Sequence, residues 1–314
     1  MPQAFPVLGA RWSGVSLGNS GTDEFFRLTG MTPGPLATLL YLHTAYFPLQ
    51  FALLTHHRFP QPFWGSMQHR NHLLLHRPVD WGTPLTLESH LIGGRSLEKG
   101  VELELHNTAW VDSGGRRTLV WESLVAYYYR GRVGVDSRAL DSPSPLAVLP
   151  PVTPPQANAF REDAEKRFVW AVPRTGDRAF ARLTGDYNGT HINRWYARLM
   201  GFPSPFSHAQ RVLGMSLARL PAQPGTPQNA SVGSGPAADH DFDSGALRLD
   251  VWLKGPVYYH HPVRLQSAVA PEDHAATWFN LFLAGEGRPA LRGRLATVPP
   301  GSGLLDEQQR PLKW

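Results

Sequence analysis

Residues 180–215 contain acidic and basic side chains whose spacing could support proton transfer. Asp186 and His191 lie five positions apart, and His208 follows seventeen positions after His191. A carboxylate and an imidazole that hold the same water can orient it, accept its proton and deliver a proton to a substrate. An isolated Asp-x-Asn usually forms a turn, and an isolated His is usually a partly buried structural side chain. The interpretation therefore depends on the ordered set, not on any single residue.

This stretch resembles the hydratase signature of the MaoC-like proteins, approximately S/T-G-D-x-N-P-x-H, then an Ala, G-F and H-G-M. The residues that match it are Thr184, Gly185, Asp186, Asn188, His191, Ala197, Gly201, Phe202 and His208. The spacing from His191 to His208 is also that of the family. The resemblance implies an α+β protein with two hotdog domains in one chain, each a long central helix wrapped by a curved antiparallel sheet. The first half has no D-x-N-x-x-H, as in double hotdog hydratases where one half keeps the site and the other shapes the acyl pocket.

The activity that the resemblance implies is (R)-specific hydration of trans-2-enoyl thioesters, or the reverse dehydration of 3-hydroxyacyl thioesters, a lyase reaction of fatty acid metabolism. Asp186 and His191 would activate the water that attacks C3. Asp186 is expected where a strand gives way to a loop, and His191 at the start of a short helix. Gly185 would let that loop bend, Asn188 would fix it by side-chain hydrogen bonds, and His208 would support the site. The resemblance implies no metal or redox cofactor; coenzyme A or an acyl carrier protein would be part of the substrate.

Two departures from the signature bear on the loop and on the oxyanion donor. Gly189 stands where the family has Pro, and Ala209 stands where it has the Gly of H-G-M. The backbone N–H of Ala209 remains the expected donor to the thioester oxygen, because a helix N-terminus stabilises developing negative charge. The methyl group of Ala209 stands where the family has only the hydrogen of Gly, close to the expected thioester carbonyl. A non-catalytic acyl-binding protein is therefore one alternative function. A hotdog thioesterase is another, although its carboxylate usually lies on the central helix, and segments 36–55 and 207–220 contain no Asp or Glu.

An internal repeat organises the chain. Residues 78–89 and 256–267 both fit P-V-x4-P-[LV]-x-L-x-S at a constant offset of 178. Each copy is preceded by a helical segment and a strand-like run and is followed by a hairpin pattern. The helical segments are residues 36–55 and 207–220, and the strand-like runs are residues 73–75 and 249–253. The hairpin patterns are residues 101–129 and 277–298. Alternating apolar residues joined by Gly-rich turns are typical of hairpins. The pattern therefore predicts a duplicated domain with a helix packed on an antiparallel sheet.

The composition of the remaining segments predicts the domain boundaries. We expect an N-terminal hotdog domain without the motif in residues 1–140 and a Pro-rich linker in residues 141–160. The C-terminal MaoC-like domain is then expected in residues 161–314. Within it, residues 221–245 are rich in Pro, Gly, Ala and Ser and are expected to form a mobile loop.

Charge and composition limit the partners. The net charge of +5 suits an anionic small ligand or an acidic carrier protein, although so modest an excess is also explained by solubility alone. No cluster of basic and aromatic residues indicates nucleic-acid binding, and the partner that the resemblance implies is an acyl-CoA or acyl-carrier-protein thioester. The sequence has no Cys, and no signal peptide is evident, so we expect a cytoplasmic protein. Residues 36–55 are uncharged, but their His, Gln, Pro, Tyr and Thr favour a helix enclosed by protein over a membrane span. The two halves would form a pseudo-dimer, so the chain is expected to be a monomer or a homodimer.

Other histidines do not indicate a metal site. They occur as His56–His57, as His69, His72 and His76, and as His260–His261. None of these groups has ligand spacing on a helix with a supporting Glu, so we expect no bound metal.

Overall fold

The structure is a computed structural model, and it describes residues 6–18, 20–131, 168–220, 245–270 and 273–306. The predicted linker at 141–160 lies outside the described residues, as does nearly all of the predicted loop at 221–245. The predicted domain boundaries near residues 140 and 161 also fall there and stay predictions. Among the described residues, no helix combines the length and apolar character needed to cross a membrane.

In the described part of the chain, ten strands form one antiparallel sheet, to which each half contributes five. The first half contains β1 (Leu8–Val15), β2 (Ser66–Leu75), β3 (Leu85–Leu97), β4 (Gly100–Ser113) and β5 (Arg116–Arg130). The second half contains β6 (Phe168–Ala171), β7 (Ala246–Leu253), β8 (Pro262–Ala270), β9 (Asp273–Leu283) and β10 (Pro289–Val298). The strand order is β1-β3-β4-β5-β2-β7-β10-β9-β8-β6, so the second half repeats the first in mirror order across the pair β2 and β7.

The repeat predicted from the sequence occupies equivalent places in the two half-sheets. Residues 78–89 lead into β3 and residues 256–267 lead into β8, and both strands lie second from an outer edge. The two predicted hairpins are β4–β5 and β9–β10, with the predicted antiparallel pairing. The duplication inferred from one short pattern is therefore confirmed by the topology. The sequence analysis named no strand before the helical segment of either half, but β1 and β6 precede the helices as edge strands.

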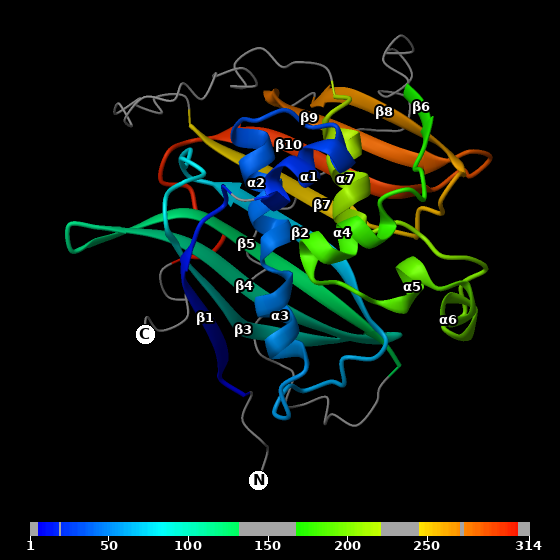
Figure 1. Cartoon of the computed structure of the whole chain (residues 1–314), viewed down its shortest axis with the longest axis horizontal. Helices are drawn as coiled ribbons and strands as arrows, with labels where there is room; N and C mark the ends of the chain where they lie inside the picture. Colours follow the sequence, from blue (N-terminus) through cyan, green and yellow to red (C-terminus); the bar gives the residue numbers. More distant parts are fainter. Residues whose placement is uncertain (1–5, 19, 132–167, 221–244, 271–272, 307–314) are drawn as a thin grey trace.

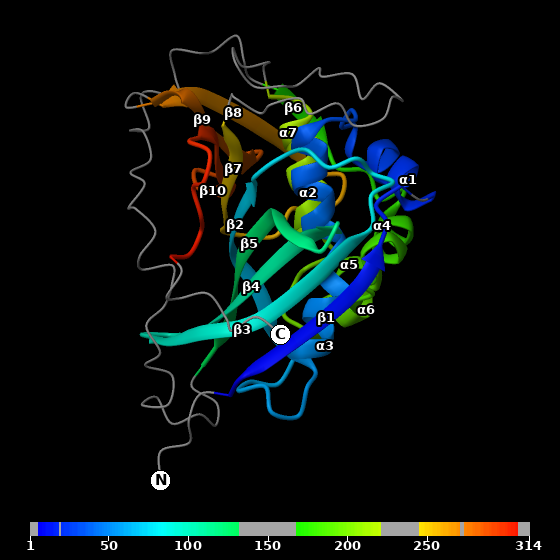
Figure 2. The same cartoon turned by 90° about the vertical axis from the view of Figure 1, so that its left-hand side faces the viewer.

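The helices lie together on one face of the curved sheet (Figures 1 and 2). They are α1 (Ser20–Thr29), α2 (Pro35–Ala45), α3 (Phe47–Leu54), α4 (Asp177–Thr184), α5 (Gly189–Ile192), α6 (Arg194–Leu199) and α7 (Ala209–Leu217). Helix α2 packs against α7 of the other half, and both contribute to one core that extends across the junction of the half-sheets. The sequence placed these two central helices correctly.

The predicted helix at 36–55 is wrong in one respect, because it is two helices. Helix α2 ends at Ala45, and α3 begins at Phe47 after a one-residue turn at Tyr46. Pro48 lies in the first turn of α3, where a missing N–H is tolerated, but inside a continuous helix it would remove a hydrogen bond and clash with the carbonyl one turn earlier. Tyr46 is buried at this junction and stacks on Trp121 of β5, with ring centroids 4.9 Å apart.

Candidate active site

The loop that carries Asp186 begins at the end of α4. Gly185 terminates this helix with a φ of 77°, a left-handed conformation that glycine adopts without strain. The hydroxyl of Thr184 accepts a hydrogen bond from the N–H of Asp186 at 3.0 Å. The predicted strand before Asp186 is therefore wrong. Residues 177–184 bury Phe180, Ala181 and Thr184 on one face, a helical spacing, and the glycine that follows is a helix cap.

Asn188 shapes the next turn as predicted. Its side chain accepts a hydrogen bond from the N–H of Thr190 at 3.1 Å and so caps α5, the short helix that contains His191. Its own N–H donates to Oδ1 of Asp186 at 3.1 Å. The departure from the signature at Gly189 has a local reason, because a Cβ there would lie 2.6 Å from the ring of Tyr196.

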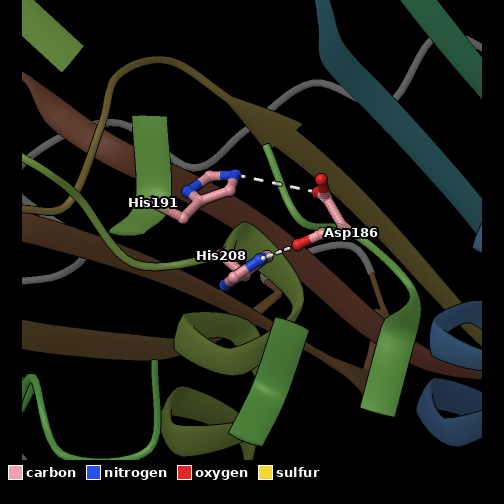
Figure 3. Close-up of side chains that lie close together, drawn as sticks. All are labelled: Asp186, His191 and His208. Carbon is pink, nitrogen blue, oxygen red and sulfur yellow. Dashed lines mark hydrogen bonds and ion pairs between the residues drawn. The ribbon is translucent and has the colours of Figure 1, made fainter. Parts of the chain in front are cut away.

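His191 points its ring at the carboxylate of Asp186 (Figure 3). The Nδ1 atom of His191 lies 2.9 Å from the carbonyl oxygen of Phe206, which can only accept, so Nδ1 carries the proton and donates it. The Nε2 atom is then an unprotonated acceptor, 3.7 Å from Oδ2 of Asp186. That separation is too long for a good direct hydrogen bond and suits two groups that hold one water between them.

His208 connects the Asp186 loop to α7. As the N-cap residue of α7, it donates from Nε2 to the backbone oxygen of Asp186 at 3.0 Å (Figure 3). Its ring lies against that of His191, with centroids 3.9 Å apart. The Nδ1 atom is buried and has no hydrogen-bond partner among the described residues. His208 thus contacts both the Asp186 loop and the His191 ring, and its supporting role in catalysis stays a prediction.

Burial controls the protonation of this cluster. Desolvation raises the pKa of Asp186, and the nearby His191 opposes that rise. Desolvation lowers the pKa of His191, against the charge of Asp186, and it lowers the pKa of His208 well below its usual value. Both imidazoles are consequently neutral near pH 7, which leaves Nε2 of His191 free to accept a proton.

Ala209 is the first residue of α7, directly after His208. The side chain of the N-cap residue makes no capping hydrogen bond, so the first backbone N–H groups of the helix remain available to a ligand. The structure thus brings together Asp186, His191 and His208, and Ala209 follows His208 at the N-terminus of α7. The three side chains also offer ligand atoms within 4.8 Å of one another, a donor set that a divalent cation could use.

The first half of the chain contacts the candidate site through residues that the sequence analysis did not name. A Cβ built on Gly185 would lie 3.4 Å from Cγ of Pro48 in α3, so α3 lies beside the Asp186 loop. Gln210, next to Ala209, donates a hydrogen bond to Gln68 of β2 at 3.1 Å. The sequence contained one indication of this contact, because Gln210 is a polar residue at the position where the H-G-M signature has Met.

Comparison with known proteins supports the resemblance, although no protein-family model matches the chain. The curated 3-hydroxyacyl-thioester dehydratase X of Mycobacterium tuberculosis is 24% identical over 196 residues, which cover 62% of this chain and 64% of that protein. The aligned part of the sequence thus spans less than two thirds of that relative.

Solved structures share the fold over almost the whole chain. The crystal structure of HtdX from Mycobacterium tuberculosis has a TM-score of 0.64 at 19% identity and covers 93% of this chain and 100% of that one. A MaoC-like dehydratase from Phytophthora capsici has a TM-score of 0.60 at 14% identity, with 94% and 96% covered. A Mycobacterium tuberculosis protein described as a double hotdog has a TM-score of 0.58 at 13% identity, again with 94% and 96% covered. The chain is therefore a double hotdog protein that has the fold of the MaoC-like dehydratases and is homologous to 3-hydroxyacyl-thioester dehydratase X.

Proposed function

We propose that the protein hydrates trans-2-enoyl thioesters to (R)-3-hydroxyacyl thioesters, or catalyses the reverse dehydration. The observation that carries this proposal is the pair of Asp186 Oδ2 and His191 Nε2, 3.7 Å apart, in which His191 is buried and Asp186 is partly buried. The homologue's name, a 3-hydroxyacyl-thioester dehydratase, supports the same chemistry.

In the hydration direction, the two side chains bind one water and direct its oxygen at C3 of the substrate. As the C3–O bond forms, a proton leaves the water for the Asp186–His191 pair, and a proton from the pair is delivered to C2 on the same face. The hydrogen bond from Nδ1 of His191 to Phe206 fixes the tautomer that this step requires. Dehydration runs through the same groups in reverse.

Negative charge develops on the thioester oxygen while water adds. The N–H of Ala209 is the donor that we assign to this oxygen, because it lies at the positive end of α7 and adjoins the His208 that holds Asp186. Coenzyme A or an acyl carrier protein serves as the handle of the substrate. The proposal involves no metal or redox cofactor and needs one chain for one site, whether the protein is a monomer or a homodimer.

An assay at the absorbance of the enoyl thioester tests the proposal, with a panel of CoA thioesters from C4 to C16. Loss of absorbance with formation of the (R)-3-hydroxyacyl thioester supports it. Release of free thiol would instead identify a thioesterase, which the lack of Asp and Glu in α2, α3 and α7 disfavours. Binding of acyl-CoA without any reaction would identify a non-catalytic acyl-binding protein and overturn the proposal.

A further inference from the structure

A chain of hydrogen bonds joins the two halves beside the proposed catalytic pair. Gln210 of α7 donates from Nε2 to Oε1 of Gln68 at 3.1 Å. Gln68 donates from its own Nε2 to the hydroxyl of Tyr127 on β5 at 3.0 Å. Tyr127 in turn donates to Oε1 of Gln50 on α3 at 2.7 Å. Every bond runs in the same direction, so the last free donor of the chain is the amide nitrogen of Gln50.

This chain lies on the side of the site that the first half supplies. One end is Gln210, the neighbour of Ala209, and the other is Gln50, on the helix whose Pro48 contacts the Asp186 loop. Burial chiefly raises the pKa of Tyr127, and the charge of Asp186 contributes to that rise, so the phenol lies within electrostatic reach of the catalytic carboxylate.

A β-bulge turns Gln68 toward this side of the sheet. Strand β2 pairs Gln68 with Tyr127, and His69 is then an extra residue without a partner in the register. Leu73 faces the core, so strict alternation places Asn71 inward and would place Gln68 outward. Because of the extra residue, Gln68 points inward instead of outward and contacts both Tyr127 and Asn71. The Nδ2 atom of Asn71 lies 3.4 Å from Oε1 of Gln68.

Two atoms of this cluster lack partners. The Nε2 atom of Gln50 and the Oδ1 atom of Asn71 are buried and have no hydrogen-bond partner among the described residues. The two residues are 1% and 2% exposed. Buried polar atoms are normally paired, because an unpaired one loses its hydration without compensation. One of these atoms is a donor and the other an acceptor, and their residues are hydrogen-bonded to the neighbouring side chains Gln68 and Tyr127. A hydroxyl group has the chemistry to satisfy both atoms, because it can accept from one and donate to the other.

We propose that Gln50 and Asn71 form a subsite for a hydroxyl group on the acyl chain of the substrate, beyond the carbons that react. The proposal rests on the proposed function and narrows its substrate class to hydroxylated enoyl or 3-hydroxyacyl thioesters. An unsubstituted alkyl chain in the same place would leave both polar atoms unpaired, and sites built to hydrogen-bond a hydroxyl discriminate strongly against analogues that lack it.

The test compares CoA thioesters of one chain length, unsubstituted or with a hydroxyl at each successive carbon beyond C4. We expect kcat/KM for the best hydroxylated substrate to exceed that for the unsubstituted one by about tenfold or more. Gln50→Leu and Asn71→Leu should each bring this ratio close to one. Tyr127→Phe, which removes the hydroxyl that holds Gln50, should lower it partly. Gln266→Leu on β8, in the other half-sheet, is the matched control and should leave the ratio at its wild-type value.

Measurements on the wild-type protein are sufficient to refute the proposed hydroxyl subsite. Calorimetry with the saturated, unreactive thioesters should show tighter binding of the hydroxylated compound. Equal kcat/KM and equal binding across the whole series would refute the subsite while leaving the proposed function in place. If no enoyl thioester reacts at all, the proposed function is refuted. The calorimetric comparison of hydroxylated and unsubstituted thioesters then tests the subsite without any activity.

Discussion

His72 and Asp250 face each other across the junction of the two half-sheets, with Nδ1 and Oδ1 2.7 Å apart and 178 positions between them in the chain. That separation is the offset of the internal repeat, so each residue is the other's equivalent. The pseudo-twofold axis of the molecule therefore passes between them. In a homodimer of identical subunits this position would pair two identical side chains, whereas the fused chain has an imidazole beside a carboxylate, which also binds Arg248.

Removing either member of the proposed catalytic pair should abolish most activity. We expect Asp186→Asn and His191→Ala each to lower the hydration rate by about two to four orders of magnitude, the usual effect of losing a positioned acid or base. Circular dichroism should show an unchanged fold. A near-normal rate in either variant would place the reacting water elsewhere.

Ala209→Gly tests the oxyanion donor. If the methyl group crowds the thioester carbonyl, its removal should raise kcat/KM, because a backbone donor acts only within about 2.7–3.1 Å of the oxyanion. The cost in helix stability should be at most about 1 kcal/mol and smaller for a residue in the first turn. An unchanged rate in an active enzyme would show that the backbone already accommodates Ala209.

The pH dependence of kcat/KM should reflect the buried imidazole. Burial lowers the pKa of His191 below its usual 6.5, and the neutral ring is the form that accepts a proton. Activity should therefore stay constant as the pH falls from 8 to 6.5 and decline only below that value. An acidic limb centred at or above pH 6.5 would contradict the neutral, desolvated His191.

Chelation should not affect the reaction. Asp186, His191 and His208 have a donor set that could ligate a cation, but the nitrogen that His208 directs at Asp186 carries a proton and donates it. We expect full activity after dialysis against EDTA. A loss of activity that Zn²⁺ restores would show instead that these residues hold a metal.

His43 should make folding sensitive to acid. This residue of α2 is buried, neither ring nitrogen has a partner among the described residues, and burial lowers its pKa from 6.5 to about 4. The unfolded chain then binds a proton near pH 5 that the folded chain excludes, so stability is full above pH 6.5 and is lost as the pH falls toward 4. The contribution amounts to about 2 kcal/mol between pH 7.5 and pH 5. Urea unfolding at both pH values should show a pH effect smaller by this amount in His43→Met; an equal effect in both proteins would contradict the assignment.

The sequence predicted the parts that depend on local patterns. The repeat at 78–89 and 256–267, the two hairpins and the central helices follow from periodicity and turn residues, and all are present. The predictions were wrong where individual helices begin and end, and at one short helix. The turn at Tyr46 depends on how two helices pack around a proline, and α4 was mistaken for a strand because its short amphipathic face was not recognised.

The candidate site was predictable only where one segment forms it. The motif from Gly185 to His208 is continuous in the chain, so its resemblance to the hydratase signature could indicate the loop at Asp186, the role of Asn188 in fixing it and the short helix at His191. Gln50 and Tyr127 are linked to Gln210 of α7 only through Gln68, across the two halves of the chain. The inward orientation of Gln68 depends on a β-bulge that the residue types do not predict. Contacts of this kind require the tertiary structure.

The pairing of β2 with β7 also determines what would follow if the halves were separated. Each half alone would expose a central strand whose hydrogen-bonding groups are now paired, and exposed edges of this kind promote aggregation. Joining both halves in one polypeptide supplies them in equal number and brings each edge near its partner during synthesis. It also allows the first half to accumulate substitutions without altering the Asp186–His208 segment of the second half, so that the two halves can evolve separately.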